Sequence, residues 1–510
     1  MLTRRSFLQL IGASGVAVTG AEYLAQVSAQ AAPAAFPNGS NGIQHVVLVM
    51  LENRSFDHLL GWLPDANGRA DMVYQAPDGN FYPNYPLAPD FQGCGYSDPD
   101  HSWEGWLVEY NFGRMDGFLQ RPTAFANNPG VTLAAANTYP AGFYTNLNPD
   151  GTPKAVPDLP VLGALAQHYT VLDHYFCSFA GETFPNRSYQ HAARTDRDHN
   201  SLKLSTLPTI WDQLSPIPNT KGVPTGAYFF RNAPYLGIFG GLKHYPFWHL
   251  YGPGDSDVLG IPVTTPNFFD TVAAGELPNV SFVDPNFALA DNGTGADDHP
   301  KADIRRGERF IADVYHALAG AGYLDNTVLV ITFDEWGGFF DHVRPPQVID
   351  DTDPATVDHT GNSTTPTDGQ LIPNYKQLGF RVPCIVVSNL ASARVAHDGP
   401  FEHTSTLKMI ETTFGLKPLT ARDANAMNLA QVLNRHVTAP VPPSAIPTSS
   451  EVPGPVGDAA VVCSAASVQS VSPAPVPERH GHAERVPAGG YPTQLGMGPL
   501  VQHYRKAPLR

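Results

Sequence analysis

The sequence predicts an α/β fold with a central, mostly parallel β-sheet. Several short apolar runs rich in Val and Ile stop at a polar residue, and they lack the clean alternation of a half-buried strand. Helical patterns lie between these runs, and such alternation of strand and helix is typical of a parallel sheet covered by helices. Because functional groups in this architecture gather beyond the carboxyl ends of the strands, the polar residues that end the runs are the first candidates for a site.

Five runs are predicted to be buried strands, and three segments are predicted to be helices. The strands are 43–51, 170–176, 279–283, 328–333 and 383–387, and the helices are 160–167, 303–318 and 404–414. In the second helix Phe310, Ile311, Val314 and Leu318 fall on one face, as an amphipathic helix requires. The third helix has Ser and Thr at its start and Gly415 just past its end, which are the expected boundary signals.

Two regions are less regular. Residues 228–251 are rich in aromatic side chains and histidine, and they fit a substrate-facing insertion and a part of the core equally well, because aromatics dominate both. Residues 350–370 are rich in Asp, Thr and Pro, and we expect a loop or lid there.

The N-terminus has the features of an export signal. Arg4 and Arg5 precede a weakly apolar stretch that contains glycine and ends in small residues, with A-x-A-like cleavage positions near Ala29 or Ala31. We therefore expect residues 1–31 to be a twin-arginine signal that delivers the protein to the periplasm, the cell surface or the medium. A membrane anchor is the weaker alternative, because the stretch is too polar and too rich in glycine to span a bilayer stably.

The rest of the chain is expected to form one large α/β domain, residues 32–437, and a Pro- and Ala-rich extended tail, residues 438–510. The net charge of −16 argues against nucleic acid as the main partner. The four cysteines, Cys94, Cys177, Cys384 and Cys463, show no C-x-x-C spacing, so a zinc knuckle is not predicted. Export permits disulfides, but the sequence leaves their pairing open.

Two adjacent pairs of polar side chains end predicted strands. Glu52 and Asn53 follow the first strand, and Asp334 and Glu335 follow the 328–333 strand. A single Asp or Glu is usually a solvated surface residue, but three carboxylates gathered at one edge of a sheet repel one another unless a cation binds them. The two pairs therefore predict a metal site. Their oxygen ligands favour Ca²⁺, Mg²⁺ or Mn²⁺, and Zn²⁺ is possible because histidines lie nearby.

The candidate nucleophile is a threonine. Thr183 lies in the stretch GETFPNR, after the 170–176 strand, where glycine and proline predict a stiff loop. A free threonine hydroxyl is a poor nucleophile, and metal coordination would activate it by favouring the alkoxide. Thr183 is therefore a candidate metal ligand as well.

Histidines beside acidic residues form a third set, which consists of His101, His299, His342 and His403. A lone histidine is more often structural than catalytic, but a neighbouring carboxylate favours the protonated, donating form. Together with Arg187, such donors could hold the oxygens of a phosphate ester, and one histidine could protonate the departing alkoxide. The three sets predict phosphoryl transfer through a covalent phosphothreonine.

The segments ENRSFDH, TFPNR, DDHP, DEWGGFFDH and EHTS, in this order, resemble the bacterial phospholipase C and acid phosphatase family of the alkaline-phosphatase-like superfamily. The resemblance runs from about residue 43 to residue 416 and implies an alkaline-phosphatase-like α/β/α sandwich, with a phosphoesterase catalytic domain at 32–437. It implies a metal held by Glu52, Asn53, Thr183, Asp334 and Glu335, with Thr183 as nucleophile. It also places His299 and His342 nearest the phosphate and leaves the roles of His101 and His403 open. Thr183 stands where sulfatases carry Cys or Ser, which argues against sulfatase activity.

Within this family we expect a phospholipase C that cleaves phosphatidylcholine-type lipids to diacylglycerol and a phosphorylated head group. An acid phosphatase with the same site is the alternative, and a non-catalytic exported binding protein is less favoured because all three residue sets are intact. The aromatics of 228–251 could cradle a choline group by cation–π contact or lie against lipid. The expected partners are a phospholipid or small phosphate ester, a membrane surface and the twin-arginine export machinery, but no nucleic acid.

Overall fold

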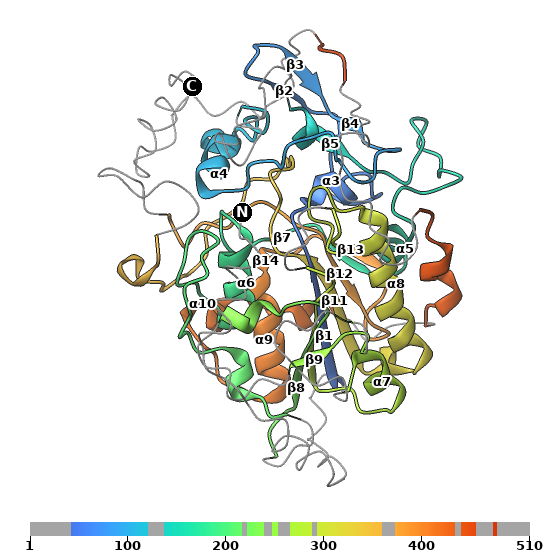
Figure 1. Cartoon of the computed structure of the whole chain (residues 1–510), viewed down its shortest axis with the longest axis vertical. Helices are drawn as coiled ribbons and strands as arrows, with labels where there is room; N and C mark the ends of the chain where they lie inside the picture. Colours follow the sequence, from blue (N-terminus) through green and yellow to red (C-terminus); the bar gives the residue numbers. More distant parts are fainter. Residues whose placement is uncertain are drawn as a thin grey trace.

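An eight-stranded sheet of order β13-β6-β12-β11-β1-β10-β8-β9 forms the centre of the protein (Figure 1). The computed structural model describes residues 42–120, 137–216, 222–238, 247–252, 255, 266–287, 293–359, 373–433, 440–454 and 473–476. The three middle strands are β11 (Thr327–Phe333), β1 (His45–Leu51) and β10 (Val280–Val283), and they run parallel to one another. Nearly all their residues are buried, as expected for apolar runs covered on both faces.

Five further strands extend the sheet. They are β8 (Gly226–Phe230) and β9 (Phe247–His249) on one side, and β12 (Cys384–Val387), β6 (Thr170–Leu172) and β13 (Arg394–Ala396) on the other. Only β12 is reversed among the described strands of this sheet, since it pairs antiparallel with β11 and β6. The predicted strand 170–176 is broken into β6 and β7 (Tyr175–Phe176), because Asp173 and His174 turn the chain between them, and β7 pairs with β14 (Phe401–Glu402) outside the main sheet.

Helices cover both faces of the sheet (Figure 1). The helices α5 (Pro160–His168), α7 (Phe268–Ala273) and α8 (Ile304–Gly320) lie on one face, and α6 (Thr183–Ala192), α9 (His403–Phe414) and α10 (Ala421–Asn425) lie on the other. In α8 the predicted apolar face, which includes Phe310, Val314 and Leu318, is buried. The predicted α/β/α sandwich with a mostly parallel sheet is confirmed.

Smaller elements lie beyond the carboxyl ends of the central strands (Figure 1). They are the helices α3 (Phe56–Leu60) and α4 (Trp103–Tyr110) and two small sheets, β2 (Val73–Gln75) with β3 (Phe81–Pro83) and β4 (Tyr85–Pro86) with β5 (Gly142–Phe143). Short 3-10 helices occur at Asn111–Gly113, Tyr139–Ala141, Ile210–Gln213, Tyr235–Ile238, Tyr323–Asp325, Pro354–Thr356, Leu429–Val432, Pro443–Ala445 and Ser449–Glu451. The helices α3 and α4 and the two small sheets thus lie at the sheet edge at which the predicted site residues lie.

The aromatic region 228–251 supplies core strands in its described part. Every residue of β8 is buried, and the ring centroids of Tyr228 and Phe282 lie 4.8 Å apart across the sheet. The core alternative is therefore correct for β8 and β9, and residues 239–246 lie outside the described residues. The choline cradle expected from this region has no support in these strands.

The described part of the C-terminal region lies against α8. Arg309 donates to the Val452 carbonyl at 2.5 Å, one ring nitrogen of His316 lies 3.1 Å from the Ile446 carbonyl, and Ile446 and Val452 are buried. The predicted tail thus includes a segment that packs on helix α8. The predicted signal at 1–31 lies outside the described residues, as does residue 463.

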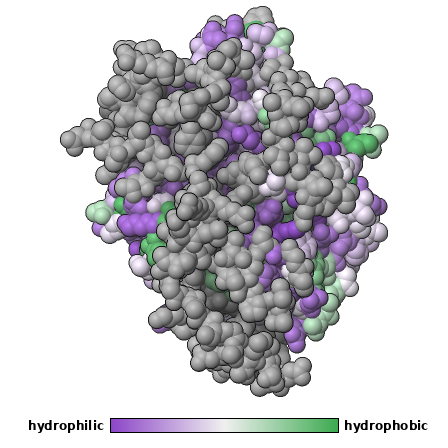
Figure 2. Space-filling model, viewed as in Figure 1, coloured by the Kyte–Doolittle hydropathy of each residue, from purple (hydrophilic) through white to green (hydrophobic). Residues whose placement is uncertain are grey.

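The described surface in Figure 2 is mostly hydrophilic, with small hydrophobic patches between the polar residues. Within the described part of the chain, the exposed large hydrophobic residues are Phe112, Val156, Leu204, Tyr251 and Ile349. Among the described helices, none combines the length and hydropathy that a bilayer crossing requires. Cys94 is disulfide-bonded, whereas Cys177 and Cys384 are free, buried thiols.

Candidate active site

Thr183 is the first residue of helix α6, so the prediction of a loop at this position is wrong. Pro185 lies in the first turn of the helix, where a missing N–H leaves no helical hydrogen bond unmade. The side-chain amide of Asn186 holds the segment that precedes the helix, because its Nδ2 donates to the carbonyls of Gly181 at 2.8 Å and Glu182 at 3.1 Å. The sequence did contain a signal for the start of a helix here, because proline is common in the first turn of helices.

Arg187 lies one turn after Thr183, on the same face of α6. Its guanidinium is fully buried and contacts carboxylates at the ends of three strands. Nη2 lies 3.3 Å from Glu52 Oε1, Nη1 lies 3.1 Å from Asp284 Oδ1, and Nε lies 3.2 Å from Asp334 Oδ2. The helix that begins with Thr183 is therefore fixed to the carboxyl edge of β1, β10 and β11.

Asp284 is a member of this cluster that the predicted site omits. It directly follows β10, so the rule that selected Glu52 and Asp334 would have selected it too. Besides Arg187, it accepts a hydrogen bond from the Tyr228 hydroxyl. Burial raises the pKa of Asp284 to about 6, although the positive charge of Arg187 opposes that shift.

The structure brings four of the five predicted metal residues together, namely those that follow the ends of β1 and β11. The backbone N–H groups of Asn53 and Glu335 both donate to Asp334 Oδ1, at 3.2 and 2.7 Å. Asn53 adopts a left-handed conformation, with φ 60°. Gly337 is needed beside it, because a Cβ there would come within 2.0 Å of the Asn53 carbonyl oxygen. The backbone thus fixes Glu52, Asn53, Asp334 and Glu335 in one small region.

Several buried polar atoms of this region lack a hydrogen-bond partner among the described residues, namely both amide atoms of Asn53 and Oε1 of Glu335. Such atoms are rare in folded proteins and cost stability. Burial, and after it the charge of Asp334, raises the pKa of Glu335 well above its usual value. A divalent cation contacting Asn53 Oδ1 and Glu335 Oε1 would remove both penalties. The donor set therefore fits a hard metal ion.

Among the described residues, a group whose ligand atoms all lie within 4.8 Å of one another, close enough to hold a metal, consists of Asp57, Asp341 and His342. Here the guanidinium of Arg381 already lies 3.0 Å from each carboxylate, and His342 Nδ1 lies 2.6 Å from Asp57 Oδ2. This arrangement places His342, which was expected nearest the phosphate, in an ion-pair network with Arg381. Among the described residues the two candidate groups share no member.

His101 and His299 lie next to each other. Their rings meet edge to face with centroids 6.5 Å apart, and His299 Nε2 is 4.0 Å from Asp98 Oδ2. The loop before His299 is tied to the first strand end, because the Glu52 N–H donates to the Asp297 carbonyl at 2.7 Å. Both histidines therefore flank the predicted metal residues.

His403 lies behind Asp334 and is fully buried. One ring nitrogen is 2.7 Å from the Asp334 carbonyl and the other is 3.2 Å from the Tyr175 hydroxyl. Burial lowers the pKa of His403, so the ring is neutral near pH 7. His403 thus contacts the backbone of Asp334 from a buried position.

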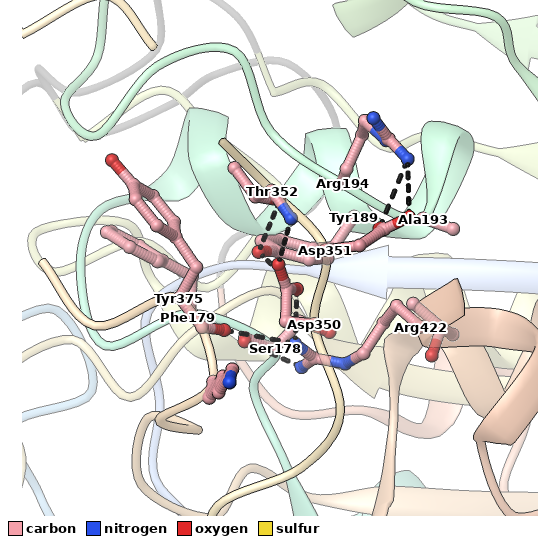
Figure 3. A network of polar contacts seen from close by, with 12 residues as sticks. Ser178, Phe179, Tyr189, Ala193, Arg194, Asp350, Asp351, Thr352, Tyr375 and Arg422 are labelled. Atoms are coloured by element: carbon pink, nitrogen blue, oxygen red, sulfur yellow. Dashed lines mark hydrogen bonds and ion pairs between the residues drawn. The ribbon is translucent and has the colours of Figure 1, made fainter. Parts of the chain in front are cut away.

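A buried arginine supports α6 from the other side (Figure 3). Arg422 Nη1 lies 2.8 Å from Asp350 Oδ2, which also accepts from the Tyr189 hydroxyl at 2.8 Å. Its Nη2 donates to the Ser178 carbonyl at 2.9 Å, and its Nε is 3.1 Å from Glu402 Oε1. Arg422 thus joins the segment before α6, the helix itself and the start of α9.

Comparison with known proteins identifies the family of the chain. The model of the Phosphoesterase family matches residues 43–417. "Phospholipase C B" of Mycobacterium tuberculosis is 32% identical over 438 residues, which cover 78% of this chain and 79% of that protein. "Non-specific phospholipase C6" of Arabidopsis thaliana is 29% identical, with 78% and 73% coverage.

Two solved structures are also similar. One is a protein in the alkaline phosphatase superfamily from Vibrio parahaemolyticus, with 9% identity, a TM-score of 0.32, and coverage of 84% of this chain and 78% of that chain. The other is the lipoteichoic acid synthase LtaP from Listeria monocytogenes, with 10% identity, a TM-score of 0.34, and coverage of 84% and 82%. The family match spans most of the chain and confirms the predicted resemblance. This chain belongs to the phosphoesterase family and is a hydrolase of phosphoric ester bonds.

Proposed function

We propose that this protein is an exported, metal-dependent phospholipase C, which cleaves phosphatidylcholine-type lipids to diacylglycerol and a phosphorylated head group. The observation that carries the proposal is the placement of Thr183 one turn from Arg187, whose guanidinium contacts the strand-end carboxylates. The relatives named phospholipase C favour this activity over that of an acid phosphatase.

In the proposed reaction the Thr183 hydroxyl loses its proton to solvent, its oxygen attacks phosphorus, and the bond from phosphorus to the glycerol oxygen breaks. His101 or His299, whose rings lie next to each other, donates the proton that the departing alkoxide needs. Water then attacks phosphorus and releases the head-group phosphate, while one water proton returns to the threonine oxygen and the other to the histidine. A divalent ion held by Glu52, Asn53, Asp334 and Glu335 would supply the positive charge that favours ionisation of the hydroxyl.

Export by the twin-arginine route is part of the proposal and rests on the sequence of residues 1–31. The disulfide at Cys94 supports it, because disulfides persist outside the cytosol. Contact with a lipid surface is included because the proposed substrate resides in one.

The substrate test compares phosphatidylcholine vesicles with p-nitrophenyl phosphate over a series of pH values. We expect release of diacylglycerol from phosphatidylcholine at a higher kcat/KM than turnover of the monoester. Turnover of the monoester alone would identify an acid phosphatase, and hydrolysis of neither ester would contradict both proposed substrates.

Removal of divalent metal by a chelator is expected to abolish hydrolysis and lower the Tm, because Asn53 Oδ1 and Glu335 Oε1 have no hydrogen-bond partner among the described residues and would lose their contact with the ion. Re-addition of Ca²⁺, Mg²⁺ or Mn²⁺ should restore both quantities, and Zn²⁺ is tested beside them. In the variant Asn53→Ala the chelator should change the Tm less, whereas the exposed control Asn80→Ala should respond like the wild type. A chelated protein with unchanged activity and Tm would contradict the metal site.

A further inference from the structure

Helix α6 receives no cap from the residue that precedes it. Glu182 occupies the cap position in an extended conformation, and its side chain makes no hydrogen bond to the helix amides. Instead, Asn200 from the loop after the helix caps the first turn. Its Oδ1 accepts from the Phe184 N–H at 2.8 Å, and its own N–H donates to Glu182 Oε2 at 2.6 Å. Asn200 therefore holds both chain neighbours of Thr183.

This pattern resembles a capping box, in which two residues satisfy each other's backbone groups. Here, however, the capping residue Asn200 lies far along the sequence from the start of the helix. Asn200 is separated by 16 positions from Phe184 and by 18 from Glu182. The position of the Asn200 loop therefore controls the first turn of α6. The Arg422 network cannot replace this contact, because it reaches the helix at Tyr189, further along the chain.

The loop itself is held by a buried ion-pair cluster. His199 Nδ1 lies 2.8 Å from Asp198 Oδ1, and Nε2 lies 3.5 Å from Glu104 Oε2 of α4. Asp198 also pairs with His359, whose Nδ1 is 2.5 Å from Oδ2. Burial opposes a charge on His199, but its bonds to Asp198 and Glu104 outweigh burial and raise the pKa to about 11. The ring is therefore a cation that joins the loop to α4.

We propose that Asn200 is a positioning residue of the active site, which acts through Glu182 and Phe184 to orient the hydroxyl of Thr183. His199 holds the Asn200 loop in place for this purpose. The proposal rests on the proposed role of Thr183 as nucleophile. A shift of about 1 Å in a reacting group can lower a rate by roughly 10²-fold, so the contact at Phe184 N–H has a measurable consequence.

The test compares Asn200→Ala, which removes the acceptor, with Asn200→Asp, which keeps an oxygen at the same place. Because a carboxylate is a good partner for a helix N-terminus, Asn200→Asp should recover most of the lost activity. We expect Asn200→Ala to lower kcat on phosphatidylcholine by roughly 10- to 100-fold, with KM nearly unchanged. The matched control is Asn148→Ala, which removes side-chain bonds of an exposed loop asparagine and should leave kcat unchanged.

A kcat of Asn200→Ala within about twofold of the wild type, or an equal loss in Asn200→Asp, would overturn the proposal, since such changes fall below the expected positioning effect. Should Asn200→Ala fail to fold, His199→Gln replaces it, and there a wild-type kcat overturns the proposal while a lowered kcat at unchanged KM supports it. Thr183→Ala, measured in parallel, distinguishes a failure of the proposed nucleophile from a failure of the positioning role of Asn200. If Thr183→Ala remains active, the role of Thr183 as nucleophile in the proposed function fails; if it is inactive while Asn200→Ala keeps full kcat, only the positioning role fails.

Discussion

The variant Thr183→Ala is expected to lose hydrolysis of every phosphate ester by roughly 10⁴- to 10⁶-fold, the range seen when a nucleophile is removed from an active site. No other oxygen at the start of α6 can replace the hydroxyl, because the flanking residues are Glu182, which is bound to Asn200, and Phe184. The protein should still fold, since alanine is a good helix former and the position is the first of α6.

The matched variant is Thr183→Ser, which keeps the hydroxyl and removes only the methyl group. It should retain a measurable fraction of the wild-type rate. Acid quenching during turnover, followed by mass spectrometry of the peptide that contains Thr183, should detect a phosphorylated residue in the wild type and in the serine variant. An active alanine variant, or a phosphate trapped on another residue, would contradict the proposed nucleophile.

The variant Arg422→Met is expected to lower the free energy of unfolding by about 3–5 kcal/mol, the usual cost of removing one partner from a buried ion pair. The change leaves the carboxylates of Asp350 and Glu402 buried without their cation and leaves the Ser178 carbonyl without its donor (Figure 3). Denaturant unfolding and the Tm measure the loss.

The control lies in the same network. Arg194 pairs with Asp351 at 3.1 Å, but the two side chains are 31% and 45% exposed, whereas those of Arg422 and Asp350 are each 1% exposed. Exposed pairs contribute about 0–1 kcal/mol, so Arg194→Met should change stability little. Equal losses in the two variants would show that burial does not govern this network.

The sequence predicts the centre of the fold well because its signals are local. The apolar runs of β1 and β11 and the amphipathic pattern of α8 need no knowledge of their neighbours. The grouping of Glu52 and Asn53 with Asp334 and Glu335 follows from a general rule about strand ends, since parallel neighbours end at the same edge.

Features that depend on contacts between distant segments are harder to predict from the sequence. The reversed direction of β12 depends on which strand it pairs with, and an apolar run does not encode that. The start of α6 at Thr183 was missed because Pro185 is equally compatible with a loop and with a first helical turn. The pairing of His342 with Asp57 and Arg381 joins three separate segments, so no local pattern reveals it.

The place of Arg187 among Glu52, Asp284 and Asp334 has a consequence for the order in which the protein matures. One guanidinium offsets part of the repulsion among three acidic groups, so the strand ends can assemble before any ion is present. In the proposed function, a divalent ion would therefore bind to strand ends that Arg187 already holds together. We expect the metal-free protein to be a folded species that can be isolated and then reconstituted.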